Sequence, residues 1–113
     1  MKQLLIAGLL IATAANTDRA NASETWITCT PVEIATYQVR LHVRCAAAVG
    51  GITFFAVGTL DTANASRVLA VLTAAQIAGR TLNILFDPAD QSGAAIGCAT
   101  ADCRLIRAIG YGR

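Results

Sequence analysis

Polar and apolar side chains alternate without interruption between residues 37 and 45. The apolar positions Val39, Leu41, Val43 and Cys45 alternate with the polar positions Gln38, Arg40, His42 and Arg44. Because successive side chains of a β-strand point to opposite faces, this period of two predicts a half-buried strand. Four further segments, residues 26–32, 52–60, 81–87 and 104–109, are rich in β-branched and apolar residues and also predict strands.

A helix is predicted between the third and the fourth of these strands, over residues 63–79. Asp61 or Thr62 can cap its first turn, because a short side-chain oxygen can accept a hydrogen bond from an otherwise unpaired backbone N–H. Gly79 lies where a left-handed helix terminus favours glycine. The pattern therefore delimits the helix at both ends.

This helix is apolar on most of its sides. Apart from Arg67 and Gln76, its faces carry apolar or small residues, among them Val71 and Ile77. A helix of this kind is usually covered on most sides. One small sheet cannot cover all of it, so we expect self-association through helix 63–79, with plain exposure of small residues as the alternative.

The predicted order is three strands, one helix and two strands, in a mainly β domain with one helix. This is the order of the OB-fold, a small five-stranded Greek-key barrel. An open α+β sandwich, with the helix on one face of an antiparallel sheet, has the same order. The order of elements leaves both open, and we take the OB-like barrel as the first prediction and the sandwich as the alternative.

Residues 1–22 are predicted to be a secretory signal peptide. Lys2 precedes an apolar run of about 12 residues, and Ala-Asn-Ala at residues 20–22 matches the small-x-small cleavage pattern. The run is shorter than the roughly 20 residues of a membrane-spanning helix, so we expect no membrane span in the mature form. Residues 23–113 then form a single domain, secreted or periplasmic. Its seven arginines and six carboxylates give no reason to expect nucleic acid as a partner.

All four cysteines lie in the predicted mature domain, and four cysteines allow three pairings. If the first two strands form an antiparallel hairpin centred near Tyr37, Cys29 and Cys45 face each other at the separation that a disulfide needs. Cys98 and Cys103 can close a short loop before the last strand. We therefore predict the disulfides Cys29–Cys45 and Cys98–Cys103. A zinc site or a redox pair is the alternative, but neither pair has the two-residue gap of those motifs, so we expect no metal and no cofactor.

Three short motifs occupy the C-terminal half: AGRTLNILFDP at residues 78–88, AIGC at residues 95–98 and DCR at residues 102–104. In this series a helix ends in a glycine, a strand follows, and a short cysteine loop precedes the last strand. The series resembles the B subunits of the bacterial subtilase cytotoxin, typhoid toxin and pertussis-like group, over roughly residues 29–109. The resemblance implies an OB-fold, a ring of five subunits with the helices facing a central pore, and binding of host glycans, often sialylated. The chain lacks the tryptophan- and tyrosine-rich loop of those subunits, so no glycan-contacting residue is carried over.

Arg40, His42 and Arg44 form a row on the polar face of the second predicted strand, a region that often meets ligands in OB-folds. Such a row can bind an anion, for example the carboxylate of a sialic acid, through charge-assisted hydrogen bonds. The alternative is a solvated polar face, which strand alternation also predicts. Stacking aromatics are sparse, which argues against nucleic acid. Trp26 and Tyr37 are interpreted as packing residues.

No motif ties His42, the only histidine, to a serine or a cysteine, so we expect no enzyme and no catalytic residue. Asp87, Asp90 and Asp102 lack the spacing of a known calcium loop and fit turn sequences. We therefore expect an exported binding module that recognises glycans or a protein partner as an oligomer. A monomeric exported inhibitor or accessory protein is the alternative.

Overall fold

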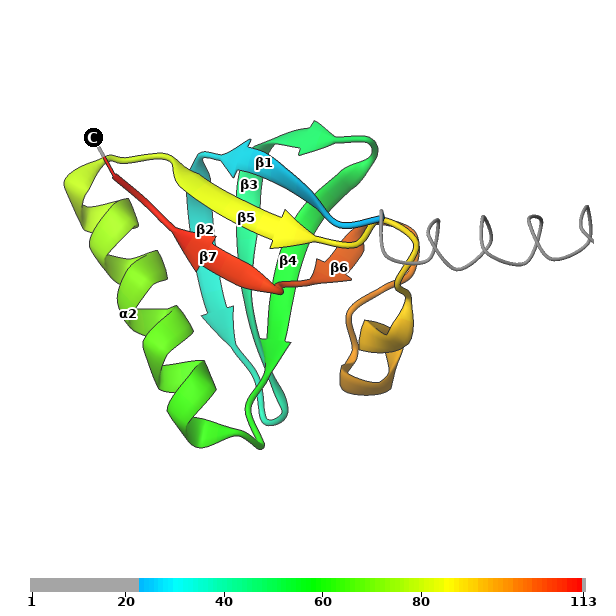
Figure 1. The fold of residues 1–113 in the computed structure, drawn as a ribbon. Helices are drawn as coiled ribbons and strands as arrows, with labels where there is room; N and C mark the ends of the chain where they lie inside the picture. The colour runs from blue at the N-terminus through cyan, green and yellow to red at the C-terminus, as the bar shows by residue number, and fades with distance from the viewer. Residues whose placement is uncertain (1–22, 113) are drawn as a thin grey trace, which may run out of the picture.

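The computed structural model describes residues 23–112, and within them the chain forms two β-sheets and one α-helix (Figure 1). The first sheet has the order β1 (Thr25–Cys29), β5 (Leu82–Phe86) and β7 (Ala108–Gly110). The second sheet has the order β2 (Pro31–Thr36), β3 (Arg40–Val49), β4 (Ile52–Gly58) and β6 (Cys103–Leu105). Helix α2 (Thr62–Ala78) joins β4 to β5, and a short 3₁₀-helix, η1 (Ser92–Ile96), precedes β6. The predicted signal peptide, residues 1–22, lies outside the described residues.

The prediction of a mainly β domain with one helix is confirmed, and two sheets with one helix are consistent with the α+β sandwich alternative. The first predicted strand is divided at Thr30, because β1 pairs with β5 whereas β2 pairs with β3 in the other sheet. Pro31 has no N–H to donate, and the register shifts between Pro31 and Glu33. The chain therefore passes from one sheet to the other at this point.

The last predicted strand is divided in the same way. Its first part, β6, pairs in parallel with β4, and its second part, β7, pairs antiparallel with β5. Ile106 and Arg107 form the link: the N–H of Ile106 donates to the carbonyl of Ala56, and the N–H of Arg107 donates to the carbonyl of Leu85. The prediction of one continuous strand over residues 104–109 is therefore wrong.

Strand β3 begins at Arg40 and not at residue 37, because the chain turns there. The N–H of Tyr37 donates to the carbonyl of Arg40 at 2.6 Å, which closes the hairpin between β2 and β3. Leu41, Val43 and Cys45 are buried, as the alternation predicts. Val39 lies within the turn and is exposed instead.

Helix α2 has the predicted ends, and the sheets bury only one stripe of it. Asp61 Oδ1 accepts from the N–H of Asn64 at 3.1 Å, and Gly79 ends the helix with a φ of 67°. The buried stripe consists of Val68, Leu72 and Ala75. The opposite face is uncovered within the described chain, and Ile77 is 83% exposed on it. The fold alone therefore does not cover this apolar helix.

Both predicted disulfides are confirmed. Cys29–Cys45 joins β1 to β3 and so ties the two sheets together, with Cα atoms 5.3 Å apart. Cys98–Cys103 closes the loop between η1 and β6. Disulfides of this kind are typical of proteins in oxidising compartments. Within residues 23–112, no helix combines the length and the apolar character that crossing a membrane requires.

Candidate functional site

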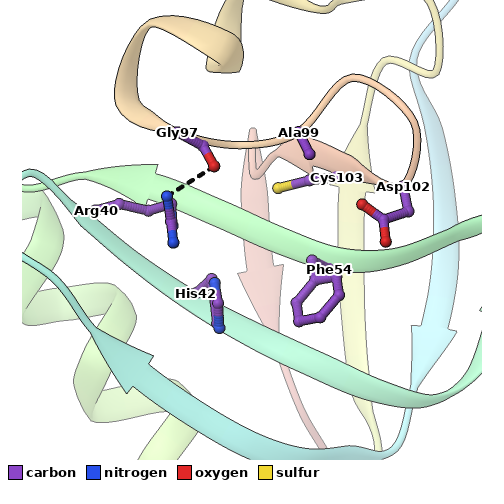
Figure 2. Close-up of a pocket in the computed structure, with 7 residues that line it drawn as sticks. All are labelled: Arg40, His42, Phe54, Gly97, Ala99, Asp102 and Cys103. Atoms are coloured by element: carbon purple, nitrogen blue, oxygen red, sulfur yellow. Dashed lines mark hydrogen bonds between the residues drawn. The ribbon is translucent and has the colours of Figure 1, made fainter.

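Arg40, at the start of β3, is fixed by the loop that follows η1. Its Nη1 atom donates to the carbonyl of Ile96 at 3.1 Å and to that of Gly97 at 2.7 Å. Its guanidinium carbon lies 4.2 Å from the centre of the Tyr37 ring, a cation–π distance. Figure 2 shows the hydrogen bond from Arg40 to Gly97, which line the same hollow. The guanidinium therefore already has partners within the chain.

His42 lies two residues farther along β3 and is only 6% exposed. Its ring centre is 5.3 Å from that of Tyr37 and 5.0 Å from that of Phe54. The Nε2 atom is 3.6 Å from Glu33 Oε1 and has no hydrogen-bond partner among the described residues. Burial lowers the pKa of His42, and the positive charge of Arg40 acts in the same direction, whereas Glu33 opposes the shift. His42 is therefore held in its neutral form near neutral pH.

These two side chains meet in a hollow of about 150 Å³, which we call the Arg40 hollow (Figure 2). Its lining consists of Arg40, His42, Phe54, Gly97, Ala99, Asp102 and Cys103. Arg44 does not line it, and its Nε atom lies 3.7 Å from Glu33 Oε1 instead. Of the predicted row of three, Arg40 and His42 therefore line the hollow, whereas Arg44 lies beside Glu33. The alternative of a solvated polar face is wrong for His42, because aromatic rings cover it. Anion binding by the row stays a prediction.

The aspartates predicted to form turns do so. Asp87 Oδ1 accepts from the N–H of Ala89 at 2.9 Å, and Asp90 Oδ1 accepts from that of Ser92 at 2.9 Å. Asp102 lies apart from them, in the lining of the Arg40 hollow. The hydrogen bonds from Ser92, with the nearby Arg107, lower the pKa of Asp90 to about 2.

A second hollow, which no sequence pattern above indicates, lies on the outer face of the β1-β5-β7 sheet. We call it the Trp26 hollow; it measures about 490 Å³ and is lined by Trp26, Asn83, Ile109, Gly110, Tyr111 and Gly112. Trp26 is 57% exposed and Tyr111 is 40% exposed. The interpretation of Trp26 and Tyr37 as packing residues is therefore wrong for Trp26, and Tyr37 is 52% exposed as well. The alternation in β1 was an available signal, because Ile27 packs on the core and its neighbour Trp26 must face outward.

The floor of the Trp26 hollow is formed where β5 and β7 pair. Asn83 is opposite Gly110 in the register, and a Cβ atom added to Gly110 would meet nothing within 4 Å. The glycine therefore leaves the space above the sheet open. The side chain of Arg80 donates to the carbonyl of Gly112 and fixes the C-terminal wall. The described lining residues are uncharged, so the hollow suits a neutral ligand with one apolar face and polar groups for Asn83.

Comparisons of the chain with protein-family models, with curated proteins and with solved structures give no significant match.

Proposed function

We propose that the chain is an exported binding module that recognises a carbohydrate in the Trp26 hollow. The exposed aromatic side chains of Trp26 and Tyr111 at one uncharged hollow carry this proposal. The apolar face of a sugar ring packs on an aromatic ring, and the amide of Asn83 can donate to or accept from a hydroxyl group. Two disulfides in a chain of this size support the exported, oxidising location.

We further propose that the two sheets form one OB-like barrel. In support, only Thr30 separates β1 from β2, and only two residues separate β6 from β7. If each pair is counted as one bent strand, the pairings lead around a full circle and back to the first strand. The chain then has five long strands with α2 between the third and the fourth, which is the predicted order.

The resemblance to toxin B subunits also suggests assembly into an oligomer through α2. The outward face of α2 carries Leu69, which is 37% exposed, and Ile77. Exposed apolar residues on one face of a helix are typical of an interface. Several subunits would present several copies of the Trp26 hollow to one glycan-bearing surface, and multivalent contact increases the overall affinity.

A glycan array probed with the purified protein tests the carbohydrate proposal. We expect binding to a defined set of glycans, and we expect Trp26→Ala to weaken it about tenfold or more, because the largest contact surface of the hollow is lost. Tyr37→Ala is the matched control, since Tyr37 is as exposed as Trp26 but lies at the Arg40 hollow. Failure of the protein to bind any glycan contradicts the proposal. Loss only with Tyr37→Ala points to the Arg40 hollow, which adjoins Tyr37, and equal loss in both variants also contradicts the proposal, because binding then does not depend specifically on Trp26.

A further inference from the structure

A groove of about 380 Å³ lies between helix α2 and the segment that leads into β7. On the helix side its lining residues are Asn64, Arg67, Val68 and Val71. Each of these positions has another member of the set three or four residues away, so together they form one stripe along the helix. On the other side, residues 106–109 line the groove. Figure 1 shows α2 and β7 on the same side of the molecule, and the two elements are in contact.

The groove is bordered by the backbone edge of β7. Of these lining residues, Ala108 and Ile109 belong to β7, and consecutive side chains of a strand face opposite ways, so their joint presence indicates an edge and not one face. β7 pairs with β5 on one side, and in the described part of the chain no strand pairs with its other side. An unpaired edge offers N–H and C=O groups to an added strand.

The groove also combines an apolar floor with a free positive charge. The apolar lining residues are Val68, Val71, Ile106 and Ile109, which are buried or half-buried. At the rim, Arg67 is exposed and forms no ion pair with any described residue. Arg107, on the opposite rim, is already paired with Glu24 and Asp90 at 2.9 Å each. The one uncompensated charge at the groove is therefore that of Arg67, as far as the described residues extend.

We propose that this groove binds an extended, acidic peptide segment of a partner protein. The segment adds as a strand to the free edge of β7, and its backbone pairs with Ala108–Gly110, because the N–H groups of Ile106 and Arg107 already donate within the chain. An apolar side chain of the segment packs on the floor, and a neighbouring carboxylate pairs with Arg67. The groove shares Ile109 with the Trp26 hollow, but its other lining residues differ, and the peptide proposal does not depend on carbohydrate binding.

An NMR titration of isotopically labelled protein tests this proposal. The probe is a synthetic seven-residue peptide that alternates valine with threonine and carries one glutamate. We expect the amide signals of residues 64–71 and 106–110 to shift, while the indole signal of Trp26, the only tryptophan, stays in place. Arg67→Gln should weaken binding about two- to fivefold, the range of an exposed ion pair. Ala101→Glu changes the net charge equally at an exposed position in the Cys98–Cys103 loop, and it should leave the affinity unchanged.

A second peptide with the same side chains and N-methylated amides cannot pair with a strand edge, and it should not bind. The proposal is overturned if the first peptide shifts no groove signal, if the methylated peptide binds equally well, or if Arg67→Gln and Ala101→Glu have the same effect. Shifts of residues 106–110 that depend on protein concentration alone would identify a second copy of this chain as the occupant, and they would overturn the peptide proposal.

Discussion

Two arginines act as internal hydrogen-bond donors that hold loops against the sheets. Arg40 donates to the carbonyls of Ile96 and Gly97. Arg104, which is only 8% exposed, donates through Nε to the carbonyl of Pro88 and through Nη1 to that of Thr100, both at 2.7 Å. Hydrogen bonds from a charged donor are stronger than neutral ones, and an unpaired buried guanidinium would be costly. These side chains therefore fix the walls of the Arg40 hollow.

Gly97 is the residue on which the position of Arg40 depends. Its φ is +89°, and a Cβ atom there would overlap Nη1 of Arg40. Gly51 has a similar φ of +82° but open space around it. We expect Gly51→Ala to lower the free energy of unfolding by about 1 kcal/mol through backbone strain. Gly97→Ala should lower it by about 1 to 2 kcal/mol more, because Arg40 must leave its carbonyl partners.

Urea unfolding of the two glycine variants measures this difference. An equal decrease in the free energy of unfolding for Gly97→Ala and Gly51→Ala would contradict the prediction. It would mean that the Arg40 guanidinium can move without a cost in stability, and that its hydrogen bonds contribute little.

His42 makes the stability of the domain dependent on pH. The unfolded chain protonates this imidazole with an ordinary pKa of about 6.5, whereas the folded state lowers it through burial and Arg40. The folded state therefore binds the proton less readily. Its contribution is fully present above the unfolded pKa and is lost as pH falls through that value toward the folded pKa. We expect the free energy of unfolding to decrease between about pH 7.5 and pH 5.

An NMR titration of the untagged protein checks the cause directly, since His42 is the only histidine. A folded-state pKa at or above the ordinary value would contradict this prediction. Asp90 is not a competing cause, because its folded pKa of about 2 and its ordinary pKa of 3.8 both lie below the pH range of the experiment.

The sequence could indicate which residues of the site share a strand, but not what they contact. Alternation places Arg40, His42 and Arg44 on one face of β3. The partners of Arg40 are backbone carbonyls 56 and 57 positions away. Every residue has a backbone carbonyl, so the residue types do not indicate which one accepts the hydrogen bond. The exposure of Trp26 could be predicted from the sequence, because Trp26 alternates with Ile27. The pairing of β5 with β7, which completes the Trp26 hollow, could not be predicted.

At the level of elements, the prediction is correct where residues close in sequence determine the ends of an element. Helix α2 has its ends at Asp61 and Gly79 because a side-chain cap and a left-handed glycine act within a few residues. It failed for the two strands that change sheet, at Thr30 and at residues 106–107. At these two points the pairing partner determines where one strand ends and the next begins. The sequence does not show this, because strand propensity is the same on both sides of the break.

The disulfide Cys29–Cys45 also shows how a local pattern can fix a distant contact. The hairpin turn at Tyr37 sets the register of β2 and β3, and that register places Pro31 opposite Cys45. Cys29 lies just beyond the bulge, within disulfide distance. Because β1 belongs to the other sheet, this bond between neighbouring segments becomes a link between the sheets.

In the whole molecule, the Arg40 hollow and the Trp26 hollow lie in different places and share no lining residue. The Arg40 hollow adjoins the loop after η1, which Figure 1 places across the sheets from α2. The Trp26 hollow lies near the C-terminal end of α2, because Arg80, which follows the helix, donates to Gly112 in its wall. Assembly through α2 would therefore bring copies of the Trp26 hollow close to the boundaries between subunits.

The mass of the protein in solution tests that assembly. We expect light scattering to give several times the mass of one subunit, because the outward face of α2 has no cover within the described chain. Ile77→Lys, at a position 83% exposed on this face, should reduce the mass to that of one subunit, since a charge is costly in an apolar interface. Leu60→Lys is the matched control: Leu60 is 90% exposed in the loop before α2, so the same chemical change there should leave the assembly intact. A wild-type protein with the mass of one subunit would instead favour the monomeric inhibitor or accessory protein.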